Sequence, residues 1–184
     1  MLYQIFSFLL DIAIGVLGGA CLLRAYMQRQ RISFSNPVGR FIFALTDWVV
    51  LPLRRVIPSF AGWDMASLLA AFLLSLLEQA LLYLLADSSM KPALVPVLAL
   101  FGLARLAISG LTGLVIVYAI LSWFPSQSPL SDIVGRLCEP LLRPFRRLIP
   151  LLGGIDLSPL ALLILLQVGA IVLANVLRQV LLAV

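Results

Sequence analysis

The chain of 184 residues contains no histidine, only two cysteines and only eight acidic residues. Without histidine, a Ser–His or Cys–His catalytic pair is impossible, and the commonest metal ligand is missing. Cys21 and Cys138 form no CxxC motif, so we expect two reduced, structural thiols and no zinc site. The sequence also shows no glycine-rich phosphate loop. These absences predict a protein that is not an enzyme and binds neither a metal nor a cofactor.

Charge is scarce as well, and apolar residues take its place. Charged residues make up 11% of the chain and hydrophobic residues 62%, whereas a soluble domain has about 25% and roughly 45–50%. A soluble core of this size cannot hide so much apolar surface. The formal net charge of +5 indicates contact with anionic lipid rather than nucleic acid, because a nucleic-acid binder would have a polar body. The composition therefore predicts a membrane protein.

Four long apolar stretches are each long enough to cross a bilayer as a helix, which needs about 20 residues. The sequence therefore predicts an all-α, polytopic fold. The N-terminus lacks a basic region, so we expect no cleavable signal peptide. The four stretches are residues 2–26, 65–86, 93–124 and 157–184.

The two long connections, residues 27–63 and 125–155, contain nine of the twelve arginines. The opposite side of the membrane would hold little positive charge beyond Lys91 and Arg178. Because positive loops stay in the cytoplasm, we expect both connections to be cytoplasmic and both termini to lie outside. The short turn 87–92 would join spans two and three.

The chain repeats itself at an offset of 92 residues. Residues 51–58 read LPLRRVIP, and residues 143–150 read RPFRRLIP. The duplication predicts repeat 1 over 1–92 and repeat 2 over 93–184, each a span, an interfacial segment and a span. Two-span repeats have parallel orientation, and the same pairing between separate chains would give a homo-oligomer. At this offset Asp47 matches Glu139, Gly62 matches Gly154 and Asp64 matches Asp156.

The Pro-x-Arg-Arg-x-Ile-Pro segments are the strongest signal. Their prolines predict a short helix of one or two turns, bounded at both ends. Their arginines would either anchor the topology on lipid headgroups, or form a docking site for a phosphate, a specific lipid or a partner protein. These arginines are Arg54, Arg55, Arg146 and Arg147.

Charges of alternating sign follow one helical face in each connection. Arg40, Asp47 and Arg54 lie seven residues apart in the first copy. We expect either a salt-bridged polar face on an interfacial helix or a surface that recognises a partner. The second copy has Asp132, Arg136, Glu139 and Arg143.

Asp64 and Asp156 lie just before spans two and four. Asp is a good helix N-cap, and its charge suits a helix N-terminus. The alternative is that each carboxylate forms a salt bridge with the arginine pair of its own repeat.

Three charged residues lie deep inside the spans: Asp11, Glu78 and Arg105. Such residues are costly in a bilayer and are functional candidates by default. We expect the three to share one layer, as a structural ion-pair cluster or as an ion or proton pathway. Arg105 argues against a simple cation path. Arg24 and Arg178 lie nearer span ends, so we expect them to snorkel.

The paired Arg segments, Ser122-Trp123 and residues 153–159 (GGIDLSP) resemble the YggT (YlmG-related) family of small bacterial and plastid membrane proteins. The resemblance covers nearly the whole chain. It implies a multi-pass protein of the bacterial inner membrane, without enzymatic chemistry, and links to osmotic-stress tolerance and ion homeostasis.

Two functional hypotheses follow. The first is a non-enzymatic membrane scaffold or assembly factor that binds anionic lipid and a membrane-protein partner through the paired Arg segments. The second is a small channel or transporter-like protein of osmotic and ion homeostasis, built around the intramembrane charges.

Overall fold

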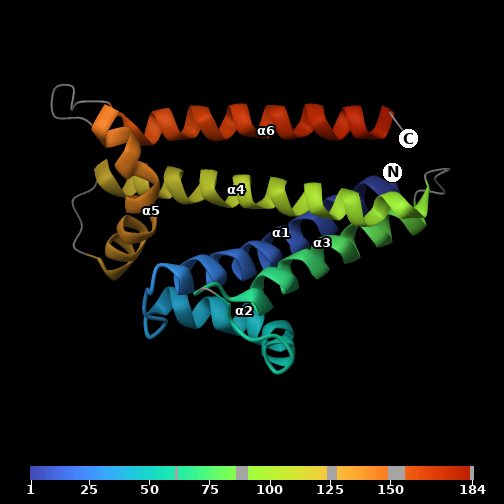
Figure 1. The fold of residues 1–184 in the computed structure, drawn as a ribbon, viewed down its shortest axis with the longest axis horizontal. Helices are drawn as coiled ribbons and strands as arrows, with labels where there is room; N and C mark the ends of the chain where they lie inside the picture. The colour runs from blue at the N-terminus through green and yellow to red at the C-terminus, as the bar shows by residue number, and fades with distance from the viewer. Residues whose placement is uncertain (61, 86–90, 124–127, 149–155, 183–184) are drawn as a thin grey trace. The chain divides into compact units, whose positions relative to one another are not determined.

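The computed structural model describes residues 1–60, 62–85, 91–123, 128–148 and 156–182, and these are helical almost throughout (Figure 1). The predicted turn at 87–90, the Ile149-Pro150 end of the second Arg segment and residues 153–155 lie outside the described residues. The first three helices are α1 (Leu2–Arg29), α2 (Pro37–Arg54) and α3 (Met65–Leu85). A short 3-10 turn, η1 (Pro92–Leu94), then leads to α4 (Val95–Trp123), α5 (Pro129–Leu148) and α6 (Ser158–Leu182).

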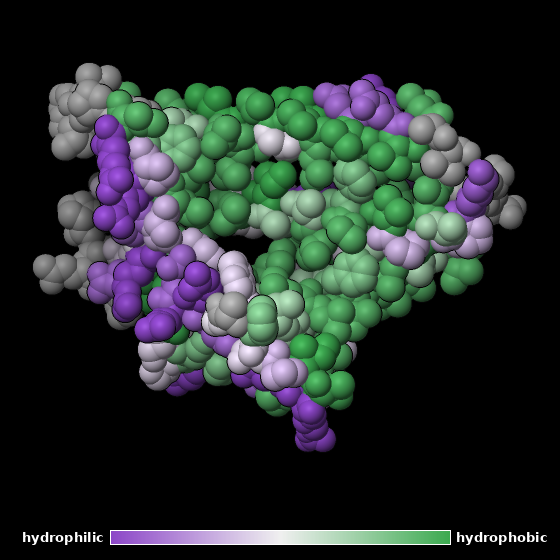
Figure 2. Space-filling model, in the orientation of Figure 1, coloured by the Kyte–Doolittle hydropathy of each residue, from purple (hydrophilic) through white to green (hydrophobic). Residues whose placement is uncertain are grey.

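The four predicted spans are confirmed. Within the described residues, α1, α3, η1 with α4, and α6 are long and apolar enough to cross a membrane. Hydrophobic side chains cover most of the visible surface of these helices, and hydrophilic side chains gather around α5 (Figure 2). The order of elements is the same in both halves: a long apolar helix, an amphipathic helix and a second long apolar helix.

The chain forms two compact units, residues 1–107 and 108–184, which divide inside α4. In the first unit α1, α2 and α3 pack together around a core that includes Cys21, Val50, Ala70 and Leu74. In the second unit α5 packs on α6 around a core that includes Val115, Cys138, Leu142 and Leu162. Burial raises the pKa of the Cys138 thiol to about 12, which keeps it protonated at neutral pH.

The Arg segments are not separate short helices, and that expectation was wrong. Pro52 lies inside α2, and Pro140 and Pro144 lie inside α5. All three prolines are on the exposed sides of their helices. A proline frees the carbonyl four residues earlier, which is on the same side. The freed carbonyls can therefore bond to water or lipid headgroups, and the apolar face of each helix stays packed.

A tight turn places the start of α3. Phe60 and Trp63 exchange backbone hydrogen bonds of 3.2 and 2.9 Å. Gly62 between them has a φ of +80°, a conformation that residues with a Cβ rarely adopt. The reversal places Asp64 directly before the first turn of α3.

Candidate functional site: two arginine–aspartate clusters and an intramembrane charge cluster

The first cluster is built around Asp64, whose side chain is 2% exposed. Its carboxylate accepts hydrogen bonds from the Ser67 amide at 3.3 Å and the Ser67 hydroxyl at 2.6 Å, which is the geometry of a helix N-cap. It also accepts from Arg54 Nη2 at 2.5 Å. Asp64 therefore both caps α3 and pairs with the first arginine of its repeat's Arg segment.

Arg24 completes this first cluster from α1. Its Nη1 donates to Thr46 Oγ1 and to Asp47 Oδ1, each at 2.7 Å. Its Nε lies 3.7 Å from Asp64 Oδ2, and its guanidinium lies 4.6 Å from the Phe43 ring centroid. The Arg24 side chain is 1% exposed, so the expectation that it snorkels was wrong. Helix α2 covers it and supplies Asp47, the nearer of the two carboxylates that compensate its charge.

The second cluster repeats this plan around Arg146. Its Nε donates to Asp156 Oδ2 at 2.9 Å, and its Nη1 donates to Glu139 Oε2 at 2.6 Å. Asp156 also accepts from the amide of Ser158, the first residue of α6, at 2.9 Å. Arg146 Nη2 bonds to the Tyr118 hydroxyl at 2.5 Å. Each repeat therefore ties the end of its amphipathic helix to the start of its second span.

The two clusters differ in depth and in the residue from the first span. Tyr118 of α4 takes the place that Arg24 of α1 has in the first repeat, and it lies 94 residues later. Each of the two residues contacts the charged side chains of its own cluster. The Asp156 side chain is 29% exposed, whereas that of Asp64 is 2% exposed. The charged network of repeat 1 is therefore buried. That of repeat 2 is more exposed and has a tyrosine in place of Arg24.

Hydrogen bonding determines the protonation of both aspartates. Burial alone would raise the pKa of Asp64, but hydrogen bonds from Arg54 and Ser67 outweigh it and hold the pKa below its ordinary value of 3.8. Burial is likewise outweighed at Asp156 by hydrogen bonds from Ser158 and Arg146, so its pKa is also lowered. Burial would lower the pKa of Arg146, but Asp156, Tyr118 and Glu139 raise it overall.

The second arginine of each segment is placed differently from the first. Arg55 and Arg147 are exposed, and neither has an ion-pair partner in the part of the chain that the structure describes. Arg40, Arg136 and Arg143 are exposed as well. On α5, Glu139 pairs with Arg146 rather than completing a ladder with the flanking arginines. The two segments therefore share one pattern: the first arginine is paired with an aspartate, and the second, here called the open arginine, is exposed.

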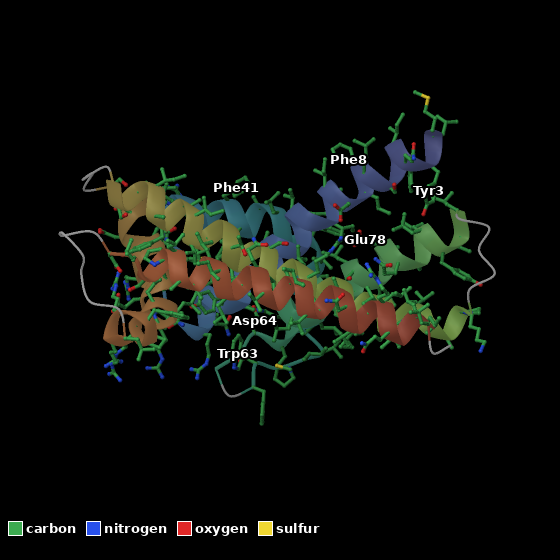
Figure 3. All side chains as sticks on the ribbon, turned by 90° about the horizontal axis from the view of Figure 1, so that it is seen from above. Tyr3, Phe8, Phe41, Trp63, Asp64 and Glu78 are labelled. Atoms are coloured by element: carbon green, nitrogen blue, oxygen red, sulfur yellow. The ribbon has the colours of Figure 1, made fainter. Side chains whose placement is uncertain are left out.

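The intramembrane charges lie together in the first unit. Arg105 Nη2 donates to Asp11 Oδ1 at 2.8 Å, and the Glu78 carboxyl lies near that of Asp11. Glu78 is 6% exposed, and Figure 3 shows it far along α3 from Asp64. Nearby, Ser75 donates to the Ala99 carbonyl at 2.9 Å. A polar layer therefore joins α1, α3 and α4 within otherwise apolar helices.

Sequence reasoning missed Arg24, Thr46 and Tyr118. The sequence carried no clear signal for the Arg24 contacts, because Asp47 and Asp64 already had candidate basic partners in their own connection. Among the described residues, no group of three His, Cys, Asp or Glu side chains has the geometry of a metal site.

Comparison with known proteins agrees with the repeat and with the membrane architecture. The family model described as CCB3/YggT matches residues 3–85 and again residues 97–177. The protein named "Uncharacterized protein YggT" of Escherichia coli K12 is 38% identical over 178 residues, covering 94% of this chain and 90% of that protein. The "Uncharacterized protein in proC 3'region" of Vibrio alginolyticus is 35% identical over 173 residues, covering 92% and 94%.

A plastid protein also matches over a shorter stretch. The "YlmG homolog protein 2, chloroplastic" of Arabidopsis thaliana is 48% identical over 54 residues, covering 28% of this chain and 22% of that protein. No solved structure matches the chain. The double match of one family model, together with the duplicated helices and ion-pair clusters, places this multi-pass membrane protein in the CCB3/YggT family.

Proposed function

We propose that the chain is a non-enzymatic membrane scaffold whose open arginines, Arg55 and Arg147, hold anionic lipid headgroups. One observation carries the proposal. In each repeat the first arginine is engaged by an aspartate, and the second is exposed beside it. The engaged arginine orients the helix end, so that the open arginine is held at the boundary where a span begins.

The membrane supplies the ligand for these arginines. With four crossings, α2 and α5 would lie on one membrane face, and the arginine-rich connections favour the cytoplasmic face. A basic residue near an anionic leaflet contributes about 1 kcal/mol. A guanidinium suits a phosphate because its planar fork can donate two hydrogen bonds at once.

The exposed face of α5 is the proposed surface for a membrane-protein partner. It carries charges of both signs and no exposed aromatic residue, a composition that favours recognition over insertion into lipid. Besides Arg147, which is assigned to lipid, its exposed charged residues are Asp132, Arg136, Glu139 and Arg143. Co-purification from native membranes should lose partner protein when Arg136 and Arg143 are both replaced by glutamine. Unchanged partner recovery would contradict this part of the proposal.

Lipid binding can be measured by native mass spectrometry of the purified protein with phosphatidylglycerol and phosphatidylcholine. The double variant Arg55→Gln/Arg147→Gln should lose about 2 kcal/mol of preference for phosphatidylglycerol, roughly a thirtyfold change. Because these side chains are exposed, the thermal stability of the variant should stay near that of the wild type.

The matched control is Lys91→Gln/Arg178→Gln, which removes the same number of positive charges from the opposite predicted face. This control should retain the lipid preference. If both double variants lost the preference for phosphatidylglycerol equally, net charge alone would explain it and the proposal would be overturned. An unchanged preference in Arg55→Gln/Arg147→Gln would also overturn it.

The intramembrane cluster supports a second candidate function, a small channel or transporter-like protein of ion homeostasis. Its observation is the contact of Asp11 with both Arg105 and Glu78 inside apolar helices. Charged groups at that depth are costly and mark ion or proton pathways in many membrane proteins.

Ion flux in proteoliposomes tests the second candidate. If the cluster lies on a pathway, Arg105→Leu should change the rate or the ion selectivity of flux across an imposed gradient. The control Arg178→Leu, also on an apolar helix, should leave flux unaltered. An absence of flux in the wild type under every gradient would exclude a channel and leave the cluster as a structural ion pair.

A further inference from the structure

Helix α2 presents an exposed stripe that is apolar in its centre and basic at both ends. Phe41 and Trp48 on this stripe are 63% and 61% exposed, and the opposite side of the helix packs on α1 and α3. In Figure 3, Phe41 and Asp64 lie on opposite sides of the picture. An outward aromatic stripe is typical of a helix that contacts lipid. The stripe consists of the exposed residues Arg40, Phe41, Ala44, Trp48, Leu51, Pro52 and Arg55; Pro37 and Arg54 are exposed as well.

The polar groups of this region are arranged so that the stripe can enter an apolar phase. Trp48 Nε1 donates to the Leu45 carbonyl at 2.8 Å, so the indole loses no hydrogen bond when water is removed. Asp47 is the one charged residue between Arg40 and Arg54; it pairs with Arg24, and its side chain stays 41% exposed. The stripe itself contains no charged residue from Phe41 to Pro52.

The spacing of the charges decides the orientation of α2. Arg40 and Arg55 are separated by about 22 Å along a helix that rises 1.5 Å per residue. A helix in the membrane plane keeps both guanidinium groups at the headgroups. A helix that entered along the membrane normal would carry Arg55 roughly 20 Å into the bilayer, where a charge is costly.

Helix α5 provides the internal contrast. At offset 92 the exposed Trp48 corresponds to Pro140, and Phe41 corresponds to Ile133, which is buried. The exposed side of α5 is charged instead. The two repeats have thus kept the same ion-pair plan and have different outer surfaces.

We propose that α2 is an in-plane membrane anchor: its Phe41–Trp48–Leu51 stripe is inserted among the upper acyl chains of an anionic leaflet, and Arg40 and Arg55 lie on lipid phosphates. The inference rests on the proposed lipid contact and deepens it, because it gives α2 an outward aromatic stripe that the described part of α5 does not have. Burial of the two aromatic rings orients the first repeat and leaves the charged face of α5 for a protein partner.

The depth of the stripe can be measured by tryptophan fluorescence in the full-length protein. One variant keeps only Trp48 (Trp63→Phe/Trp123→Phe), and a second places the single tryptophan at the other end of the stripe (Phe41→Trp/Trp48→Phe/Trp63→Phe/Trp123→Phe). Both are reconstituted in mixed phosphatidylglycerol and phosphatidylcholine vesicles, with bromine either near the headgroup end or near the methyl end of the acyl chains.

An in-plane anchor predicts the same shallow depth at both positions. Bromine near the headgroup end should quench both tryptophans more strongly than bromine near the methyl end. Aqueous iodide should quench both several-fold less than it quenches free N-acetyl-tryptophanamide. Strong iodide quenching of both would overturn the proposal. A tryptophan at 48 that lies deeper than one at 41, by about 10 Å, would show a helix entering the bilayer and would also overturn it.

The same measurement in vesicles of phosphatidylcholine alone separates this inference from the proposed function. The insertion depth should persist there, because apolar burial drives it. Loss of insertion in neutral vesicles would overturn the anchor even if Arg55 and Arg147 select anionic lipid. Unchanged lipid selectivity in Arg55→Gln/Arg147→Gln would remove the proposed function and leave the insertion depth intact.

Discussion

At the scale of single residues, the molecule separates two roles within one dipeptide. Arg54 and Arg146 bond to an aspartate ten residues later, and Arg55 and Arg147 remain exposed. From the sequence we expected the same role for all four arginines, either lipid anchoring or docking. It did not distinguish them, because the rotation of the helix end determines which neighbour points inward. The aspartate positions were better determined, because a capping residue must lie just before its helix.

Replacing Asp64 by asparagine should destabilise the protein more than replacing Asp156. Asp64→Asn leaves the nearly inaccessible Arg24 with a single carboxylate, and the loss of one partner from a buried charge network costs about 3 kcal/mol. Asp156 is far more exposed, so water compensates the loss at Arg146. Thermal unfolding in detergent, followed by intrinsic fluorescence, should give a lower Tm for Asp64→Asn. Equal losses in the two variants would contradict the difference in burial.

The stability that Asp64 supplies should depend on pH in a defined direction. Its pKa in the folded protein is lower than the ordinary 3.8, so the unfolded chain takes up its proton first as the pH falls. The contribution is complete above the ordinary value and is lost as the pH decreases through the lowered pKa. The Tm difference between wild type and Asp64→Asn should therefore be constant from neutral pH to about 5 and should shrink below about 4. A difference that disappears near pH 6 would contradict this assignment.

At the scale of elements, the amphipathic helices were only partly predictable. Each connection was expected to hold an interfacial segment, and each holds one long helix. The prolines suggested short, bounded turns, because proline interrupts the hydrogen-bond ladder. Packing of the buried side, with Val50 in α2 and Leu142 in α5, outweighs this cost. The N-cap of α2, where Asn36 accepts from the Gly39 amide at 2.8 Å, precedes Pro37 and is a local signal of a helix start.

The turn before α3 should be sensitive to the loss of its glycine. Gly62→Ala forces a Cβ into a backbone with φ of +80° and should cost about 1–2 kcal/mol, besides moving Asp64 relative to Arg54. Gly169→Ala is the control: it lies in α6, and an added Cβ meets nothing within 4 Å. This control should be neutral or slightly stabilising, by up to about 1 kcal/mol. If both substitutions leave the Tm unchanged, the turn does not depend on the glycine.

At the scale of the whole molecule, the four spans and the duplication are the firm results. The span ends agree with the sequence prediction to within three residues, and the family model matches each half. The compact units divide inside α4, whereas the sequence repeat divides before it. The reason is physical: the first part of α4 contributes Leu103 to the core of the first unit, and its later part contributes Val115 to the second.

The orientation that the arginine distribution predicts for the chain in the membrane can be measured. In a Cys21→Ala/Cys138→Ala background, Ser35→Cys lies in the α1–α2 connection, and Gln4→Cys lies near the N-terminus; both positions are exposed. A membrane-impermeant maleimide added to intact cells should label Gln4→Cys, and Ser35→Cys should react only after the cells are opened. The reverse pattern would invert the topology and place the open arginines on the outer leaflet.

The sequence by itself determined the membrane class, the four spans, the two repeats and the family, because apolar runs and repeated motifs are properties of the chain order. The tertiary structure decided which charges meet. Arg24 lies within an apolar run, and only the packing of α2 over α1 shows that it is enclosed by Thr46, Asp47 and Asp64. Ion pairs between distant residues depend on the rotation and contact of helices, and these are determined by the burial of many side chains at once.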